Sequence, residues 1–199
     1  MINFQTLHFD LRLGVIMLSM LFASGCIDPI GPAGSDDPCY DVFCGNGGTC
    51  LDGDCLCTEG WSGYECLNQI TPTSMIITRV DVIDFPAYDN GLSWDLNGSA
   101  ADITISISNA QTTLYEASTY YSDAVPANQP FAFNNVNLYI AEPLQPLNFL
   151  LYNYDEIFGG QSFMGGVNAT IYSNTNGFPS TLNVSYGSYE FKLYLDYLW

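Results

Sequence analysis

The sequence predicts an all-β protein in which a small disulfide-rich module precedes a two-sheet antiparallel β-sandwich. Six of the seven cysteines lie within residues 39–66, and so short a segment buries too little apolar area to fold without cross-links. From residue 75 to 199, apolar and polar residues alternate repeatedly and no amphipathic helix is recognisable. With 48% hydrophobic residues in 199, the chain can form one good core beside the small module.

Charge excludes several classes of function. The chain has 3 Lys and Arg against 21 Asp and Glu, a formal net charge of −18. So few cations cannot neutralise a phosphate backbone, which excludes nucleic-acid binding, and they cannot dock the chain unaided on anionic lipid. His8 is the single histidine. Loss of the N-terminal segment would therefore remove the usual base of serine and cysteine hydrolases and any histidine ligand for zinc.

Residues 1–25 have the pattern of a signal peptide. The apolar run from Leu13 to Phe22 is ten residues long, whereas a membrane-spanning helix needs about 20. We therefore expect this segment to be cleaved. The mature chain then keeps Arg79 and Lys192 as its cations and has no histidine.

The run ends in Leu21-Phe-Ala-Ser-Gly-Cys26. This segment resembles the lipobox of bacterial lipoproteins, with Ala23 where that family usually has Leu. The resemblance implies that Cys26 is lipidated and anchors the protein in the bacterial outer membrane. An ordinary secretory signal, giving a secreted protein, is the alternative. Cysteine parity favours lipidation, because six cysteines remain to pair once Cys26 is set aside.

Residues 26–38 are rich in Pro, Gly and Asp and predict a flexible tether. The six cysteines of residues 39–66 can pair in many ways, and their spacing alone fixes none. The segments Cys44-Gly-Asn-Gly-Gly-Thr-Cys50 and Cys55-Leu-Cys-Thr-Glu-Gly-Trp-Ser-Gly-Tyr-Glu-Cys66 resemble the EGF-like domain. This resemblance implies the disulfides Cys39–Cys50, Cys44–Cys55 and Cys57–Cys66. Pro38 stands where calcium-binding members have a ligand, so we expect a structural spacer here.

Residues 67–74 read as a short polar linker, and residues 75–199 as the sandwich. The clearest alternation is in residues 189–197, where apolar side chains occupy every second position. Asn-Gly pairs at 90–91, 97–98 and 176–177 predict turns. The other expected strands are 76–85, 103–107, 112–118, 131–140, 147–154, 163–172 and 181–185.

Two segments of the sandwich resemble C2-type domains, which bind calcium at one end of the fold. The first runs from Trp94 through Asp95-Leu-Asn-Gly-Ser-Ala-Ala-Asp102, and the second from Leu147 through Asn153-Tyr-Asp155 into residues 162–165. The resemblance implies Ca²⁺ ligands at Asp95, Asp102, Asn153 and Asp155. Asn153 stands where the family has Asp, and Gln161-Ser162 stands where a further Asp is expected. The alternative is that these side chains cap backbone amides in turns.

These features predict a protein that binds and does not catalyse. We expect a lipid-anchored envelope or surface protein whose sandwich contacts a protein, glycan or membrane partner through the loop end around Asp95, Asp102 and Asp155. Binding with calcium and binding without it are both open. A purely structural or assembly lipoprotein without ligand is the alternative. A glycan hydrolase using Asp81 with Asp84, or Asp155 with Glu156, is a remote one. Tyrosines are frequent, with 14 in the chain, but no spacing among them specifies a glycan-stacking platform.

Overall fold

The structure is a computed structural model that describes residues 37–95, 97–155 and 160–199. Over these residues it is all-β, apart from one short 3₁₀ turn, η1 (Pro126–Asn128). Pro38 to Trp199 forms one compact unit. The fold is therefore of the predicted class, a cysteine-rich module followed by a sandwich of two antiparallel sheets.

The cysteine-rich module contains two small ladders. Strand β1 (Thr49–Leu51) pairs with β2 (Asp54–Leu56), and β3 (Trp61–Ser62) pairs with β4 (Asn68–Gln69). The turn between β1 and β2 has positive φ at Asp52 and Gly53, 51° and 91°, as a tight two-residue hairpin requires. The module thus extends to Gln69, and only residues 70–73 separate it from the sandwich.

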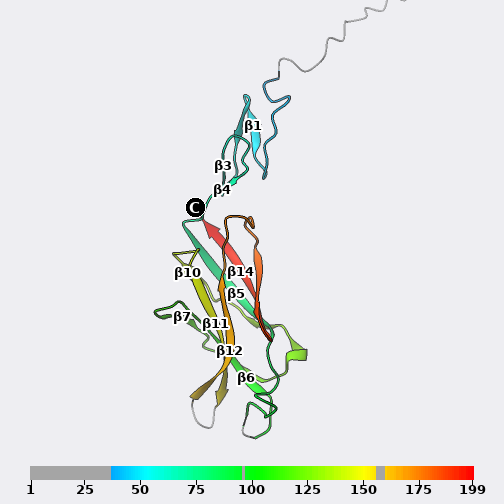
Figure 1. Cartoon of the computed structure of the whole chain (residues 1–199), viewed down its shortest axis with the longest axis vertical. Coiled ribbons are helices and arrows are strands. Elements are labelled where there is room, and N and C mark those ends of the chain that lie inside the picture. The colour runs from blue at the N-terminus through cyan, green and yellow to red at the C-terminus, as the bar shows by residue number, and fades with distance from the viewer. Residues whose placement is uncertain (1–36, 96, 156–159) are drawn as a thin grey trace, which may run out of the picture. The chain divides into compact units, whose positions relative to one another are not determined.

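Two five-stranded sheets form the sandwich (Figure 1). In the first, the order is β10-β5-β14-β13, and β9 also pairs with β5. In the second, the order is β12-β11-β6-β7, and β8 also pairs with β6. The bounds are β5 (Ser74–Asp84), β6 (Ala101–Ser108), β7 (Thr113–Glu116), β8 (Tyr121–Ala124), β9 (Phe131–Phe133), β10 (Leu138–Ile140), β11 (Pro146–Asp155), β12 (Gly160–Thr170), β13 (Thr181–Tyr186) and β14 (Tyr189–Leu198).

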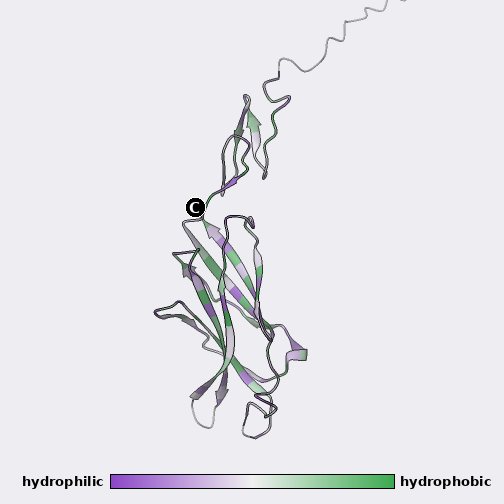
Figure 2. Ribbon diagram, viewed as in Figure 1, coloured by the Kyte–Doolittle hydropathy of each residue, from purple (hydrophilic) through white to green (hydrophobic). Residues whose placement is uncertain are grey.

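The core lies between the sheets and follows the alternation of the sequence. On β14, Phe191, Leu193 and Leu195 are buried while the side chains between them face outward. Phe149 of β11 meets Phe191 across the core, with ring centroids 6.2 Å apart. Each such side chain contributes roughly 1.5–3 kcal/mol when fully buried. Figure 2 shows the alternation as green and purple bands along the long strands.

One expected strand divides in two. The run 131–140 is predicted as a single strand, but the structure has β9 and β10 with an irregular stretch between them. Asn135 and Asn137 in that stretch have φ of 59° and 47°. Asparagine accepts this left-handed conformation better than most residues, so the residues at 134–137 interrupt the strand. Strand β8 is not predicted by the alternation, and it pairs with the first residues of β6.

Candidate functional site

The residues predicted as calcium ligands come from neighbouring elements at one end of the second sheet. Asp95 lies in the loop before β6, and Asp102 is the second residue of β6. Asn153 and Asp155 lie at the end of β11. Because β6 and β11 are paired, with Asn153 opposite Ile103, Asp102 and Asn153 lie side by side. The sheet register therefore gathers side chains that are far apart in sequence.

Asn153 is the centre of a hydrogen-bond network. Its side chain is only 2% exposed. The carbonyl oxygen Oδ1 accepts from the backbone N–H of Asp102 at 2.7 Å. The amide nitrogen Nδ2 donates to the Asp95 carboxylate at 2.9 Å and to the Trp94 carbonyl at 3.5 Å. A buried amide with both ends bonded holds its neighbours in place and leaves little capacity for a ligand.

The two aspartates extend this network. The second oxygen of Asp95 accepts from the Ser99 hydroxyl at 2.7 Å. Asp102 Oδ1 accepts from the backbone N–H of Asp123 on β8 at 2.8 Å. Asp123 has φ of 49°, an uncommon conformation that this bond helps to hold. The loop end is therefore braced across the segment before β6, β6 itself, β8 and β11.

In this arrangement the Asn153 oxygen is not offered as a calcium ligand. Ca²⁺ requires six to eight oxygens that point at one centre. Here Asn153 presents its nitrogen to Asp95, and its oxygen is already bonded to the N–H of Asp102. Among the described residues there is no group of three or more His, Cys, Asp or Glu side chains placed to hold a metal ion. Asp155 is the last residue of β11 and pairs with Gly160.

The predicted pair of Asp81 and Asp84 also has structural partners. Asp81 is 2% exposed and receives two bonds from Arg79, at 2.6 and 2.9 Å. The Tyr194 hydroxyl donates to the same carboxylate at 3.0 Å. The bond to Asp81 raises the pKa of the Arg79 guanidinium. Asp84 accepts from the backbone N–H of Phe85 at 2.9 Å.

A different feature, which the sequence reasoning did not single out, lies on the outer face of β11 and β12. It is a groove of about 370 Å³. Leu150 of β11 and Gly166 of β12, which are register partners, form its floor. We call it the outer-face groove. Its walls and ends come from two aromatic residues and two amides, Phe163, Tyr186, Asn148 and Asn168.

Adjacent glycines shape the outer-face groove. A Cβ on Gly166 would collide with the carbonyl of Phe149 and touch Leu150, and a Cβ on Gly165 would collide with the ring of Tyr189. Tyr189 in turn donates its hydroxyl to the carbonyl of Met164 at 2.5 Å. Burial raises the pKa of this phenol, and the charge of Asp89 adds to the effect. The neutral hydroxyl thus ties β14 to β12 beside the groove.

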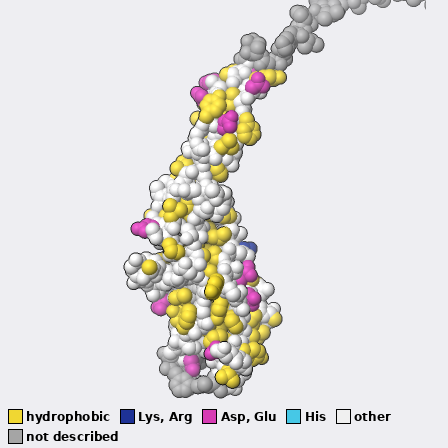
Figure 3. Space-filling model, in the orientation of Figure 1, with side chains coloured by type: hydrophobic (Ala, Val, Ile, Leu, Met, Phe, Trp, Pro, Cys, Tyr) yellow, Lys and Arg dark blue, Asp and Glu magenta, His cyan; other side chains and the backbone are white. Residues whose placement is uncertain are grey.

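Aromatic side chains continue from the groove along the same face. Phe163 is 60% exposed and meets Tyr152 edge-to-face, with centroids 5.6 Å apart. Tyr154, two positions further along β11, stacks with Tyr120 at 4.8 Å. Figure 3 shows hydrophobic side chains, in yellow, gathered along the middle of the sandwich where β11 and β12 run in Figure 1. We call Phe163, Tyr152, Tyr154 and Tyr120 the aromatic row.

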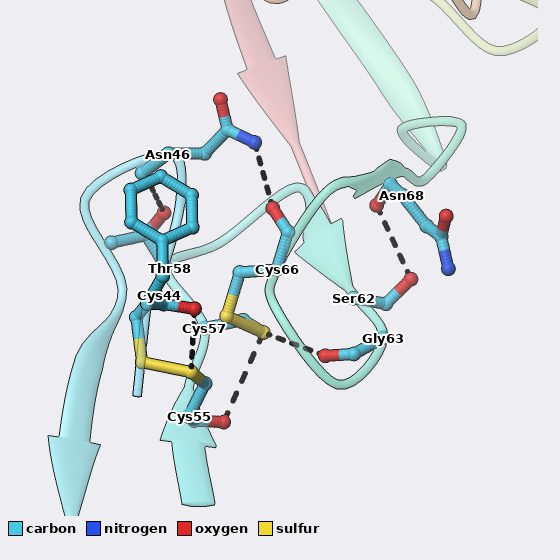
Figure 4. The surroundings of a disulfide bond; sticks show 10 residues. Cys44, Asn46, Cys55, Cys57, Thr58, Ser62, Gly63, Cys66 and Asn68 are labelled. Atoms are coloured by element: carbon cyan, nitrogen blue, oxygen red, sulfur yellow. Dashed lines mark hydrogen bonds between the residues drawn. A yellow bond between two sulfur atoms is a disulfide. The ribbon is translucent and has the colours of Figure 1, made fainter. Parts of the chain in front are cut away.

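The cysteine-rich module is held by three disulfides, at the pairs that the resemblance implies. They are Cys39–Cys50, Cys44–Cys55 and Cys57–Cys66, with Cα atoms 5.9, 5.6 and 5.3 Å apart. Figure 4 shows the second and third bonds, with Asn46 donating to the Cys66 carbonyl at 2.7 Å. Each bond closes a loop of about ten residues and stabilises the fold by roughly 2–4 kcal/mol.

Residues 40–69 match the Teneurin-like EGF domain. The match begins one residue after Cys39 and extends past the last cysteine to include β4. No curated protein matches the chain. Among solved structures, the first C2 domain of a plant extended synaptotagmin 1 is similar, with 17% identity and a TM-score of 0.36. That match covers 65% of this chain and 97% of the other.

Gln69 of the EGF-like domain bonds directly to the sandwich. Its Nε2 donates to the Tyr172 hydroxyl, the Ser173 carbonyl and the Gly177 carbonyl at 2.9–3.1 Å. Its Oε1 accepts from the backbone N–H of Gly177 at 3.0 Å. The Tyr172 hydroxyl also donates to the Ile70 carbonyl at 2.9 Å. Gln69 and Ile70, which were predicted to lie in a linker, thus connect the EGF-like domain to residues 172–177 of the sandwich by hydrogen bonds.

Several predicted features lie outside the described residues. They are the signal peptide 1–25, Cys26, most of the tether 26–38, and Glu156. Over the part of the chain that the structure describes, no helix has the length and apolar character needed to cross a membrane.

Proposed function

We propose that the protein is a lipid-anchored envelope protein that binds a partner through its sandwich and catalyses no reaction. The observation that carries this proposal is the outer-face groove with its exposed aromatic walls. Soluble domains seldom leave large aromatic side chains exposed together without a contact to make. Of the polar residues that the sequence marked as a site, Asp95, Asp102 and Asn153 are engaged in hydrogen bonds within the fold.

The cysteines support the anchor. All six cysteines of the EGF-like domain are paired, so Cys26 is the one cysteine of the sequence left over. It follows the short apolar run and small residues of the lipobox-like segment. Anchoring by several acyl chains is durable, because each buried methylene adds about 0.8 kcal/mol. Outer-membrane localisation is part of this proposal.

The absence of turnover is supported by the state of the candidate acids. A carboxylate acting as general acid or nucleophile must face the substrate. Asp81 is buried and bonded to Arg79 and Tyr194, and Asp84 is bonded to its own backbone neighbour. A chain cleaved before Cys26 also has no histidine. The structural roles of Asp81 and Asp84 support the proposal that these two acids do not catalyse a reaction.

Calcium dependence is a separate prediction at Asp95, Asp102, Asn153 and Asp155. To bind calcium, Asn153 would have to turn its oxygen toward Asp95 and give up its bond to the Asp102 N–H. We propose that these residues instead brace the loop end without metal. Differential scanning calorimetry in chelator and in millimolar Ca²⁺ should give the same midpoint. A rise of several degrees in Ca²⁺ would favour the calcium site.

The proposed function is tested by binding to the envelope. Protein lacking its first 26 residues keeps every residue that the structure describes, and it can be labelled and mixed with isolated envelope fragments of a bacterium that makes it. We expect retention by the wild type, strong loss with Phe163→Ala or Tyr186→Ala, and no loss with Tyr64→Ala. Tyr64 is a matched control, because it is 70% exposed but lies in the EGF-like domain.

The purely structural alternative predicts a different result, in which no form of the protein is retained beyond background. Binding that survives both groove substitutions would exclude the outer-face groove as the contact surface. The anchor is tested independently by mass spectrometry of the mature N-terminus. Acyl chains on Cys26 are expected, with release into the soluble fraction on Cys26→Ala, whereas an unmodified N-terminus would indicate a secreted protein.

A further inference from the structure

We infer that the outer-face groove binds a neutral saccharide, stacked on Phe163 and Tyr186 and oriented by Asn148 and Asn168. This inference rests on the proposed function, since it names the class of partner that the groove receives. The sequence has no spacing of aromatic residues that specifies such a site, and the groove forms only when the strands pack.

Charge is the first argument. The chain has a formal net charge of −18, yet none of the described residues that line the groove is charged. A polyanionic partner would be repelled by the acidic molecule, and a cationic one would be drawn to carboxylates elsewhere. A second copy of the chain is disfavoured for the same reason, because it too is strongly acidic. The occupant that matches this lining is uncharged.

The chemistry of the walls is the second argument. Phe163 is 60% and Tyr186 76% exposed, so both present ring surface to solvent. A pyranose has a face of C–H groups, which packs on an aromatic ring, and a rim of hydroxyls, which need donors and acceptors. Asn168 Nδ2 donates to Asn148 Oδ1 at 2.8 Å, and Asn148 Nδ2 donates to Ser108 Oγ at 3.4 Å. These bonds orient both amides, and each NH₂ group has a second N–H that a sugar hydroxyl can accept.

The shape of the groove is the third argument. Gly166 places no side chain over the half-buried Leu150. The groove volume of about 370 Å³ lies at the lower end of small-molecule sites. The bond from Tyr189 to Met164 and the close packing of Gly165 hold the walls without help from a ligand. Such pre-organisation lowers the entropic cost of binding. The aromatic row beyond Phe163 offers further stacking positions to an oligosaccharide.

An added peptide strand is the competing occupant, because β12 is an edge strand. Met164 has no register partner in β11, which marks a bulge, and its carbonyl already accepts from Tyr189. A bulge and adjacent glycines interrupt the regular row of backbone groups that strand addition needs. The edge is therefore poorly suited to a peptide, while the groove beside it is intact.

The test is isothermal titration of the protein lacking its first 26 residues with defined hexasaccharides. The neutral probes are hexamers of β-1,4-glucose, α-1,4-glucose, β-1,4-xylose, β-1,4-mannose and N-acetylglucosamine. Hexagalacturonate is the anionic probe. We expect at least one neutral hexamer to bind and hexagalacturonate not to bind. Phe163→Ala and Tyr186→Ala should each weaken binding about tenfold or more, and Tyr64→Ala should leave it unchanged.

Three results would overturn the inference. They are no binding of any neutral hexamer, wild-type affinity of a neutral hexamer for both Phe163→Ala and Tyr186→Ala, and tighter binding of hexagalacturonate than of the neutral hexamers. Circular dichroism spectra and melting midpoints matching the wild type would show that the variants are folded. The envelope assay separates this inference from the proposed function. Retention on envelope fragments that is lost with Phe163→Ala, together with silence toward every saccharide, would overturn the saccharide and leave the contact surface standing. Silence in both assays would overturn both.

Discussion

Replacing Asn153 by alanine tests whether the loop end is a structural brace. The substitution removes two hydrogen bonds shorter than 3.0 Å, one from the Asp102 N–H and one to the Asp95 carboxylate. A bond to a charged group contributes about 1.5–3 kcal/mol, and a neutral one about 0.5–1.5 kcal/mol. Because the side chain is 2% exposed, water does not readily replace it. The free energy of unfolding should fall by about 2–4 kcal/mol.

Urea unfolding followed by tryptophan fluorescence measures this loss. Asn183→Ala is the matched control, because Asn183 also donates to a carboxylate, Glu190 at 2.8 Å, but is exposed. An exposed pair contributes about 1 kcal/mol or less. The two variants should therefore differ by more than about 1 kcal/mol. Equal losses would refute the view that burial of the Asn153 amide makes the brace strong.

Asn153→Asp examines the same position with respect to calcium. It replaces the donor with a carboxylate about 3 Å from that of Asp95, which costs several kcal/mol without a cation. Added Ca²⁺ should recover part of that loss, because a fourth carboxylate then joins Asp95, Asp102 and Asp155. Wild-type protein should show no such gain, since its amide nitrogen occupies the place of a ligand oxygen. A wild-type gain equal to that of the variant would contradict this reasoning.

Other substitutions test the junction, the groove and the pH dependence. Gln69→Ala removes four bonds between the EGF-like domain and the sandwich, so the free energy of unfolding should fall by about 1–3 kcal/mol; an unchanged urea midpoint would show that the junction adds nothing. Gly165→Ala drives a methyl group into Tyr189 and should lower the free energy of unfolding by about 1–3 kcal/mol. An unchanged free energy of unfolding would contradict the close packing of Gly165 against Tyr189. Burial raises the pKa of Tyr197 to about 12, so its neutral form stabilises the fold below pH 10, and that stabilisation is lost as the pH rises toward 12. Tyr197→Phe should flatten the decline of the melting midpoint across this range, and an equally steep decline would exclude Tyr197 as its source.

Local patterns predicted most of the fold. The alternation on β14 and β6 comes from single strands and needs no knowledge of their partners. The EGF-like disulfides follow from a resemblance whose spacing is local. The division of the run 131–140 into β9 and β10 was not predicted. Residues 131–133 and 138–140 are largely apolar, so the whole run has the pattern of one strand despite Asn135 and Asn137. Their left-handed backbone depends on surroundings that the local pattern does not contain.

The predicted site illustrates a different limit. Sequence correctly placed Asp102 and Asn153 near the same end of the sheet, and β6 and β11 bring them into contact. It could not give the orientation of the Asn153 amide, which depends on partners 51 and 58 residues away. The outer-face groove was harder still to foresee. The groove depends on Gly165 and Gly166 of β12, Tyr189 of β14 and Tyr186 of β13. Only the packing of the two sheets brings these residues together.

The two ends of β11 use their polar residues differently. At Asn153 the amide is buried and its bonds join segments of the fold, so any ligand would have to displace structural contacts. At Asn148 the amide lies beside exposed rings, accepts from the groove residue Asn168 at 2.8 Å and donates to Ser108 of β6 at 3.4 Å. A ligand there can add contacts without breaking those that hold the sandwich. Binding through the groove is therefore compatible with an undisturbed fold, and substitutions at Phe163 should change affinity while leaving the unfolding midpoint nearly unaltered.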